Sequence, residues 1–210
     1  MKFMEIIDLS VLIEDKMPVP SENDEGYTDP PVSIVSWVGL DTKDFAVTKI
    51  EMGTHTGTHC DVTAHVVQGG KNVLDFPIET WVGWATVMDF KDIKDVSIEH
   101  VKKYAHMIRK DTILIIRNSS TDFISEDARN EIISLKPKSI IFGRGTNQRG
   151  IEDTLAYLRA GIPMIMHADY DSLDYVESND LIVALPLKIK NVEAAPMRLV
   201  AIRGLCDIGD

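Results

Sequence analysis

Short apolar runs rich in β-branched residues recur from residue 84 onward and predict strands. They lie at 84–90, 112–117, 139–143, 163–167, 181–188 and 197–204. Runs of this length and composition are typical of partly or fully buried strands. Residues 45–55 alternate between two faces instead, which is also a strand pattern. Residues 1–20 carry acids within an apolar stretch, so we expect a first strand there rather than a signal peptide.

Three segments between these runs have the features of helices. Ser97 would cap a helix over 98–108, and Ser125 would cap one over 126–135. Residues 151–161 carry acids in the first turn and a glycine at the end, as helix electrostatics and C-capping favour. Strands that alternate with helices indicate parallel pairing through helical crossovers. We therefore expect an α/β domain with a mixed, partly parallel sheet.

Length and composition indicate one ordinary globular domain. The 210 residues are 44% hydrophobic and 26% charged, which suits a single domain spanning 1–210. The net charge of −11 argues against a nucleic-acid partner, because phosphate binding requires clustered Lys and Arg. No run of about 18 apolar residues is present, so no membrane span is expected. Cys60 and Cys206 lie far apart in the sequence, which argues against a disulfide framework and favours a reducing cytoplasm.

The stretch HTGTHCDVTAH, residues 55–65, holds most of the chain's candidate chemistry. His55, His59, Asp61 and His65 are separated by even numbers of residues. In an extended segment such side chains point the same way, and a bend would bring the outer two to the same place. Two imidazoles and a carboxylate suit Zn²⁺, Mn²⁺ or Fe²⁺ with a position left for water.

Local sequence favours a strand end and a bend for this stretch. His55 and His59 also have the spacing of a helical metal pair, but the Thr and Gly residues around them are poor helix formers. Gly53 and Gly57 would let the backbone turn. Cys60 would alternate to the opposite face as a small buried residue. Histidines that serve only as hydrogen-bonded polar groups are the alternative that spacing alone leaves open.

The stretch also resembles the motif of the cyclase-like metal hydrolases, which include bacterial kynurenine formamidase and isatin hydrolase. Their pattern, H-x-G-T-H-x-D-x-P-x-H, is matched except that Thr63 replaces the proline. Segments 6–10, 17–20, 65–89 and 185–202 are similar to the family as well, so the resemblance covers most of the chain.

This resemblance implies a swivelling β/β/α domain and metal-assisted hydrolysis of a small amide, formamide or cyclic amide. His55, His59 and Asp61 match the family's metal ligands, and His65 matches its catalytic histidine. Hydroxide formed at a Zn or Mn ion would attack a carbonyl, with His65 as acid and base. The resemblance also implies a small-molecule substrate and a homodimer or tetramer.

The chain departs from the family at a second metal position. Two-metal members add a later histidine, near 153–155, and a glutamate. This chain offers Glu152 and Asp153 at the first place, and His167 or Asp169 near the second. One metal, two metals with His167 as a substitute ligand, and loss of the chemistry all remain open. We retain His167 as a candidate ligand.

Residues 143–150 would follow a strand, where α/β proteins commonly bind ligands. Arg144, Asn147 and Gln148 are candidates to hold a carboxylate or carbonyl oxygen of the substrate, and a plain polar turn is the alternative. The function we expect is a cytoplasmic metal-dependent amidohydrolase, similar to an arylformamidase. The rival functions are a non-catalytic metal- or metabolite-binding protein and a metal-dependent lyase or isomerase.

Overall fold

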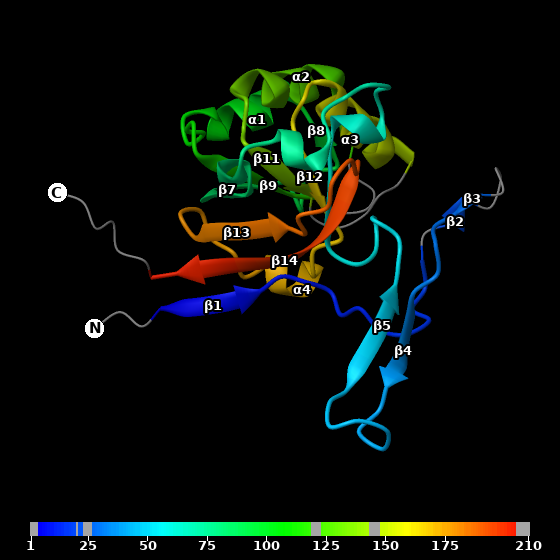
Figure 1. Ribbon diagram of the computed structural model, residues 1–210. Helices are drawn as coiled ribbons and strands as arrows, with labels where there is room; N and C mark the ends of the chain where they lie inside the picture. Colours follow the sequence, from blue (N-terminus) through cyan, green and yellow to red (C-terminus); the bar gives the residue numbers. More distant parts are fainter. Residues whose placement is uncertain (1–3, 20, 23–26, 119–122, 143–147, 205–210) are drawn as a thin grey trace.

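The computed structural model describes residues 4–19, 21–22, 27–118, 123–142 and 148–204. Its central feature is a mixed sheet that closes on itself (Figure 1). The strands of this sheet are β1 (Glu5–Asp8), β6 (His59–Asp61), β7 (Val82–Asp89), β9 (Thr112–Arg117), β11 (Ser139–Phe142), β12 (Met164–Met166), β13 (Leu181–Pro186) and β14 (Ala194–Arg203).

The strand order explains how the sheet becomes barrel-like. It runs β1-β14-β13-β7-β9-β11-β12-β6, and β6 also pairs with β14. The run from β7 through β9 and β11 to β12 is parallel, and the remaining pairs of this sheet are antiparallel. The prediction of an α/β domain with a mixed, partly parallel sheet is confirmed. The closing contact joins β6 to two strands that come more than 100 residues later, and no local pattern predicts it.

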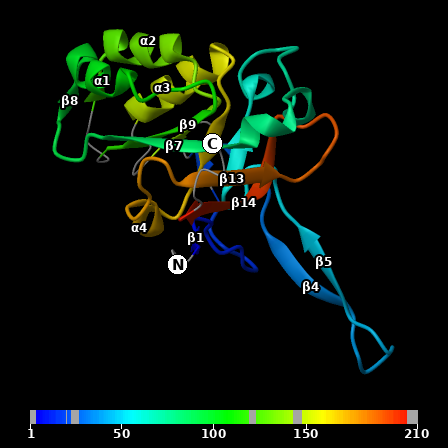
Figure 2. The same cartoon turned by 90° about the vertical axis from the view of Figure 1, so that its left-hand side faces the viewer.

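Three helices cover one face of the parallel strands, and a short fourth lies on the other side (Figures 1 and 2). They are α1 (Ile98–Ala105), α2 (Glu126–Leu135), α3 (Gln148–Arg159) and α4 (Tyr170–Leu173). Single 3₁₀ turns are η1 (Thr63–His65), η2 (Val73–Asp75) and η3 (Ile78–Trp81). The Ser125 hydroxyl accepts a hydrogen bond from the Ala128 amide, as an N-cap should. Helix α2 has the predicted bounds; α1 ends three residues early and α3 begins three residues early.

Alternate residues of the central strand β9 belong to two hydrophobic cores. Ile113 and Ile115 pack in the cluster on the side away from the three helices, together with Cys60. Leu114 and Ile116 pack in the cluster beneath α1, α2 and α3. Both faces of β9 are therefore buried, which is why its sequence reads as a continuous apolar run.

A long hairpin projects from this body (Figures 1 and 2). It consists of β4 (Ser33–Val38) and β5 (Val47–Glu51), and its described contacts between elements are mainly between its own two strands. The strand predicted within 45–55 exists as β5, but all five of its residues are exposed. Trp37 near the tip is 69% exposed. An isolated two-stranded hairpin is only marginally stable in water.

Two smaller pairs complete the strands of the described chain. They are β2 (Ser21–Glu22) with β3 (Tyr27–Thr28), and β8 (Asp95–Val96) with β10 (Phe123–Ile124). In the part of the chain that the structure describes, no helix is both long and apolar enough to cross a membrane.

Arg129 of α2 and Asp153 of α3 form a largely buried ion pair, with Arg129 Nη1 2.8 Å from Asp153 Oδ1. This pair leads to a prediction about stability. Arg129→Met should cost about 3 kcal/mol of unfolding free energy, because it leaves a buried carboxylate without its partner. The double variant Arg129→Met/Asp153→Leu should recover most of that loss, because neither charge is then buried. Urea unfolding of the single and double variants measures both. A double variant as unstable as the single variant would show that the unpaired buried carboxylate is not the cause of the loss.

Candidate metal centre

Strand β6 fixes two of the candidate ligands through its backbone. On one side His59, Cys60 and Asp61 pair with 164–166, and on the other with 194–196. Because side chains alternate along a strand, His59 and Asp61 share one face and Cys60 takes the other. Cys60 lies in the core, and burial raises the pKa of its thiol to about 12. The prediction that Cys60 is a small buried residue is confirmed.

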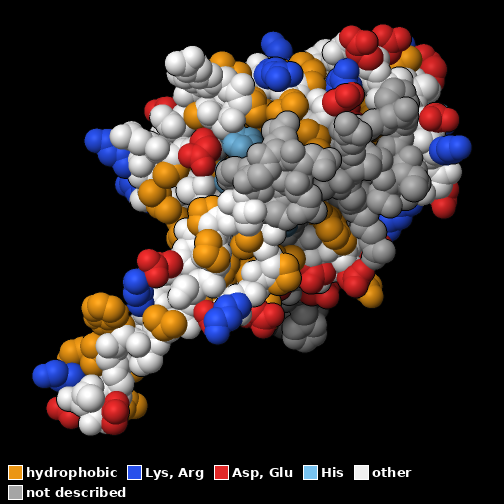
Figure 3. Space-filling model, turned by 90° about the vertical axis from the view of Figure 1, so that its right-hand side faces the viewer, with side chains coloured by type: hydrophobic (Ala, Val, Ile, Leu, Met, Phe, Trp, Pro, Cys, Tyr) orange, Lys and Arg blue, Asp and Glu red, His pale blue; other side chains and the backbone are white. Residues whose placement is uncertain are grey.

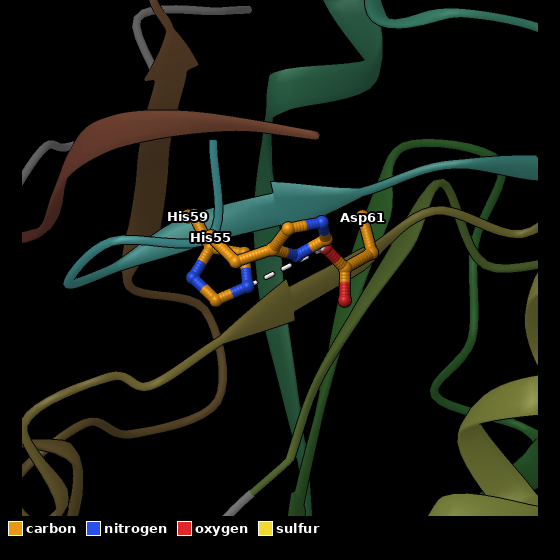
Figure 4. Close-up of side chains that lie close together, drawn as sticks. All are labelled: His55, His59 and Asp61. Carbon is orange, nitrogen blue, oxygen red and sulfur yellow. Dashed lines mark ion pairs between the residues drawn. The ribbon is translucent and has the colours of Figure 1, made fainter. Parts of the chain in front are cut away.

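His55 reaches the same place through a turn. Gly57 has a φ of 64°, which favours glycine, and the chain then enters β6. The turn brings His55 Nδ1 to 3.0 Å from Asp61 Oδ1, while His59 Nε2 lies 3.4 Å from the same oxygen (Figure 4). One ligand atom from each of the three residues lies within 4.8 Å of the other two. Among the described residues, this is the one group of three or more such side chains with metal-binding spacing.

Asp61 carries the electrostatics of the cluster. Its side chain is almost fully buried, and burial by itself raises the pKa of the carboxyl. The two imidazoles beside it outweigh that effect and hold the pKa of Asp61 well below its usual range. Neither imidazole meets Oδ1 in hydrogen-bond geometry, so this buried oxygen has no hydrogen-bond partner in the described structure. An anionic oxygen that lies between two imidazole nitrogens is an arrangement that can hold a divalent cation.

The outer nitrogens of both imidazoles face oxygen atoms. His59 Nδ1 lies 2.8 Å from the Gly57 carbonyl oxygen, and His55 Nε2 lies 3.4 Å from Glu193 Oε1. Burial lowers the pKa of His55, but the contact with Asp61 and the nearby carboxylates more than offset it, so that pKa is raised. An imidazole whose outer N–H meets an oxygen presents its other nitrogen as an acceptor, which is the usual state of a histidine ligand.

The two remaining candidate histidines lie beside this group. His65, in η1, is exposed, and its ring centre is 4.6 Å from that of His55. His167 follows β12, and its ring centre is 5.2 Å from that of His59. It has a φ of 52°, a conformation that is uncommon for a residue other than glycine and that often marks a functional site. Burial, and then the neighbouring His59, lower the pKa of His167.

A cavity of about 890 Å³ opens beside His55 and His167. Pro18, Val19 and Asp29, which come from the segment before β4, contribute to it. Its other lining residues are Val11, Met17, Thr56, Gly57, Ala168, Asp169, Tyr170 and Asp171. The wall is thus apolar with a few carboxylates, as expected of a site for a small molecule.

Sequence reasoning missed two carboxylates of this region. Asp29 is buried and lines the cavity, and Glu193 faces His55. Neither belongs to a motif. Asp29 stands in a Pro-rich loop and Glu193 precedes β14, so only the folded chain brings them to residues 55–61.

Several other candidates lie elsewhere or outside the described residues. Arg144 and Asn147 fall among the residues that are not described, and Gln148 begins α3 without a described side chain. Their assignment to substrate stays a prediction. Asp153, a candidate for the second metal position, is paired with Arg129 instead, and burial raises the pKa of its carboxyl.

Comparison with known proteins places the chain in a family and finds similar relatives. A family model described as putative cyclase matches residues 7–154. The chain belongs to the cyclase family. A kynurenine formamidase from Bacillus cereus is 26% identical over 214 residues, which cover 95% of this chain and 98% of that protein.

Solved structures share the fold. Isatin hydrolase A from Ralstonia solanacearum has a TM-score of 0.78 at 17% identity, covering 95% of this chain and 92% of that one. A predicted metal-dependent hydrolase from Bacillus stearothermophilus has a TM-score of 0.69 at 21% identity, covering 96% and 99%. This cyclase-family chain therefore shares its architecture with both proteins.

The turn before β6 can be tested with a matched pair of glycine variants. Gly57→Ala should cost about 2 kcal/mol, because it combines a positive φ with a Cβ only 2.7 Å from Ile13 Cγ1. Gly69→Ala should cost about 1 kcal/mol, since Gly69 also has a positive φ but its added Cβ meets nothing within 4 Å. Urea unfolding gives both values. Equal losses would show that the contact with Ile13 does not constrain the turn.

Proposed function

We propose that this chain is a metal-dependent hydrolase of a small amide, formamide or cyclic amide, similar to an arylformamidase. The observation that carries the proposal is the cluster of His55, His59 and Asp61, with a buried carboxylate oxygen that lacks a hydrogen-bond partner. The relatives named kynurenine formamidase and the neighbours named isatin hydrolase support the reaction class.

The donor set suits Zn²⁺ or Mn²⁺, since two imidazoles and one carboxylate are acceptable ligands for both. Such an ion, when bound, lowers the pKa of a coordinated water toward about 7 and polarises a carbonyl group. We propose one ion per chain. The pairing of Asp153 with Arg129 supports this, because it removes one candidate for a second position. His167 remains the residue through which a second ion would be held.

The roles of the protein groups follow from their places. His55, His59 and Asp61 hold the ion, and the exposed imidazole of His65 lies beside His55 at the edge of the cluster. From there His65 can give a proton to the leaving nitrogen of an amide and take one back. The substrate would occupy the cavity at 17–19 and 167–171, with Arg144, Asn147 and Gln148 proposed to bind its polar end.

We also propose that the fold is the swivelling β/β/α domain of this family, in a chain that resides in the cytoplasm. The free, buried thiol of Cys60 suits a reducing compartment. A homodimer or tetramer is proposed because the β4–β5 hairpin exposes large apolar side chains, Trp37, Leu40 and Phe45 among them (Figure 3). Exposed apolar surface of this kind marks contact sites between proteins.

Two variants separate metal binding from proton transfer. His65→Ala should retain the metal but lower kcat/KM about 100- to 10,000-fold, the range expected for loss of a general acid or base. Asp61→Ala should lose the metal and the activity together. Elemental analysis and hydrolysis rates across a panel of aryl formamides and cyclic amides measure these effects. Metal-loaded wild-type protein that hydrolyses nothing in the panel would contradict the proposed reaction, and full turnover by His65→Ala would remove that residue from it.

The hairpin makes a separate prediction about assembly. The wild-type chain should have two or four times the mass of a single chain in light scattering. Trp37→Asp/Phe45→Asp should dissociate it, because charges would replace two exposed apolar side chains at the proposed contact. Tyr175→Asp is the control, since Tyr175 is 72% exposed but lies on the body of the protein. A wild-type monomer, or an assembly that survives the double substitution, would contradict the proposed role of the hairpin.

A further inference from the structure

We infer that Glu193 is a positioning residue for His55. Glu193, His55 and the metal would then form a carboxylate–histidine–metal triad, in which the carboxylate orients the imidazole. The inference rests on the proposed function, because it concerns the same site. Its starting point is that His55 presents its two nitrogens to two different carboxylates. Nδ1 lies 3.0 Å from Asp61 Oδ1, and Nε2 lies 3.4 Å from Glu193 Oε1.

This arrangement determines which nitrogen carries the proton. A neutral imidazole has one donor and one acceptor. Nδ1 faces the cluster of ligand atoms, so it has to be the acceptor that binds the ion. Nε2 then carries the proton, on the side of the ring where Glu193 Oε1 lies 3.4 Å away. Carboxylate partners of this kind orient a metal-binding imidazole and increase its basicity.

Glu193 is itself held in place by two contacts. Its Oε1 accepts a hydrogen bond of 2.7 Å from the Thr54 hydroxyl, and its backbone carbonyl accepts one from the Val62 amide at 3.0 Å. Thr54 immediately precedes His55, and Val62 immediately follows Asp61. The carboxylate is therefore tied to the start of the segment that supplies the ligands, and the backbone of the same residue is tied to its end. A glutamate that served only solubility would not need the contact with Thr54.

The outer nitrogen of His59 faces a backbone oxygen instead of a carboxylate. This nitrogen, Nδ1, faces the backbone carbonyl of Gly57 at 2.8 Å. That partner comes with the turn and cannot be removed by changing a side chain. The partner of His55 is a side chain and can be replaced. The effect of this contact on metal binding can therefore be measured by changing Glu193.

The test measures zinc affinity of the full chain after removal of metal, by competition with a chromophoric chelator. Glu193→Ala should weaken zinc binding about 10- to 100-fold, the range found when such partners are removed. Glu193→Gln keeps an oxygen acceptor and should lose less. Glu51→Gln is the matched control, because it removes the same charge four residues before His55 in the chain, from a carboxylate that pairs with Lys49. Its zinc affinity should stay within about threefold of wild type.

A second readout distinguishes positioning from a general structural effect. Nitrogen-15 NMR of the zinc-loaded wild-type protein should show His55 protonated at Nε2, with a slowly exchanging proton that becomes fast-exchanging in Glu193→Ala. Unchanged zinc affinity in Glu193→Ala, or a His55 protonated at Nδ1, would overturn the inference alone. A wild-type chain that binds neither zinc nor manganese would overturn the proposed function, and the inference with it.

Discussion

The pairing of β6 on both sides is the constraint on which the rest of the site depends. Three residues, His59 to Asp61, join β12 to β14 and so close the sheet. Closure leaves no freedom in which way each side chain points. Cys60 goes into the core, and His59 and Asp61 must share the opposite face. The same backbone hydrogen bonds that complete the fold therefore place a carboxylate beside an imidazole.

The buried carboxylate of Asp61 is stabilised by neighbouring imidazoles but is not fully hydrogen-bonded. The imidazoles of His55 and His59 keep Asp61 ionised, yet its buried Oδ1 has no hydrogen-bond partner in the described structure. The outer nitrogen of each ring also faces an oxygen atom. His59 Nδ1 faces the Gly57 carbonyl, and His55 Nε2 faces the Glu193 carboxylate. A divalent cation is the ligand that this arrangement fits best, because it would neutralise the oxygen and use both ring nitrogens.

Sequence alone predicted what depends on neighbouring residues. The strand at 112–117, the strand predicted at 139–143 and observed at 139–142, the helix at 126–135 and the shared face of His59 and Asp61 all follow from local periodicity and capping. Closure of the sheet, the approach of Glu193 and the burial of Asp29 depend on contacts between distant segments, which periodicity does not encode. The β4–β5 hairpin shows the same limit: alternation predicted a strand, but all five residues of β5 are exposed.

The most direct measurement is anomalous diffraction at the zinc edge from crystals of the chain loaded with one equivalent of zinc. The account predicts a single strong peak between His55, His59 and Asp61, with ligand distances of about 2.0–2.2 Å. A peak at another place, or no peak at this cluster, would contradict a metal centre built on β6.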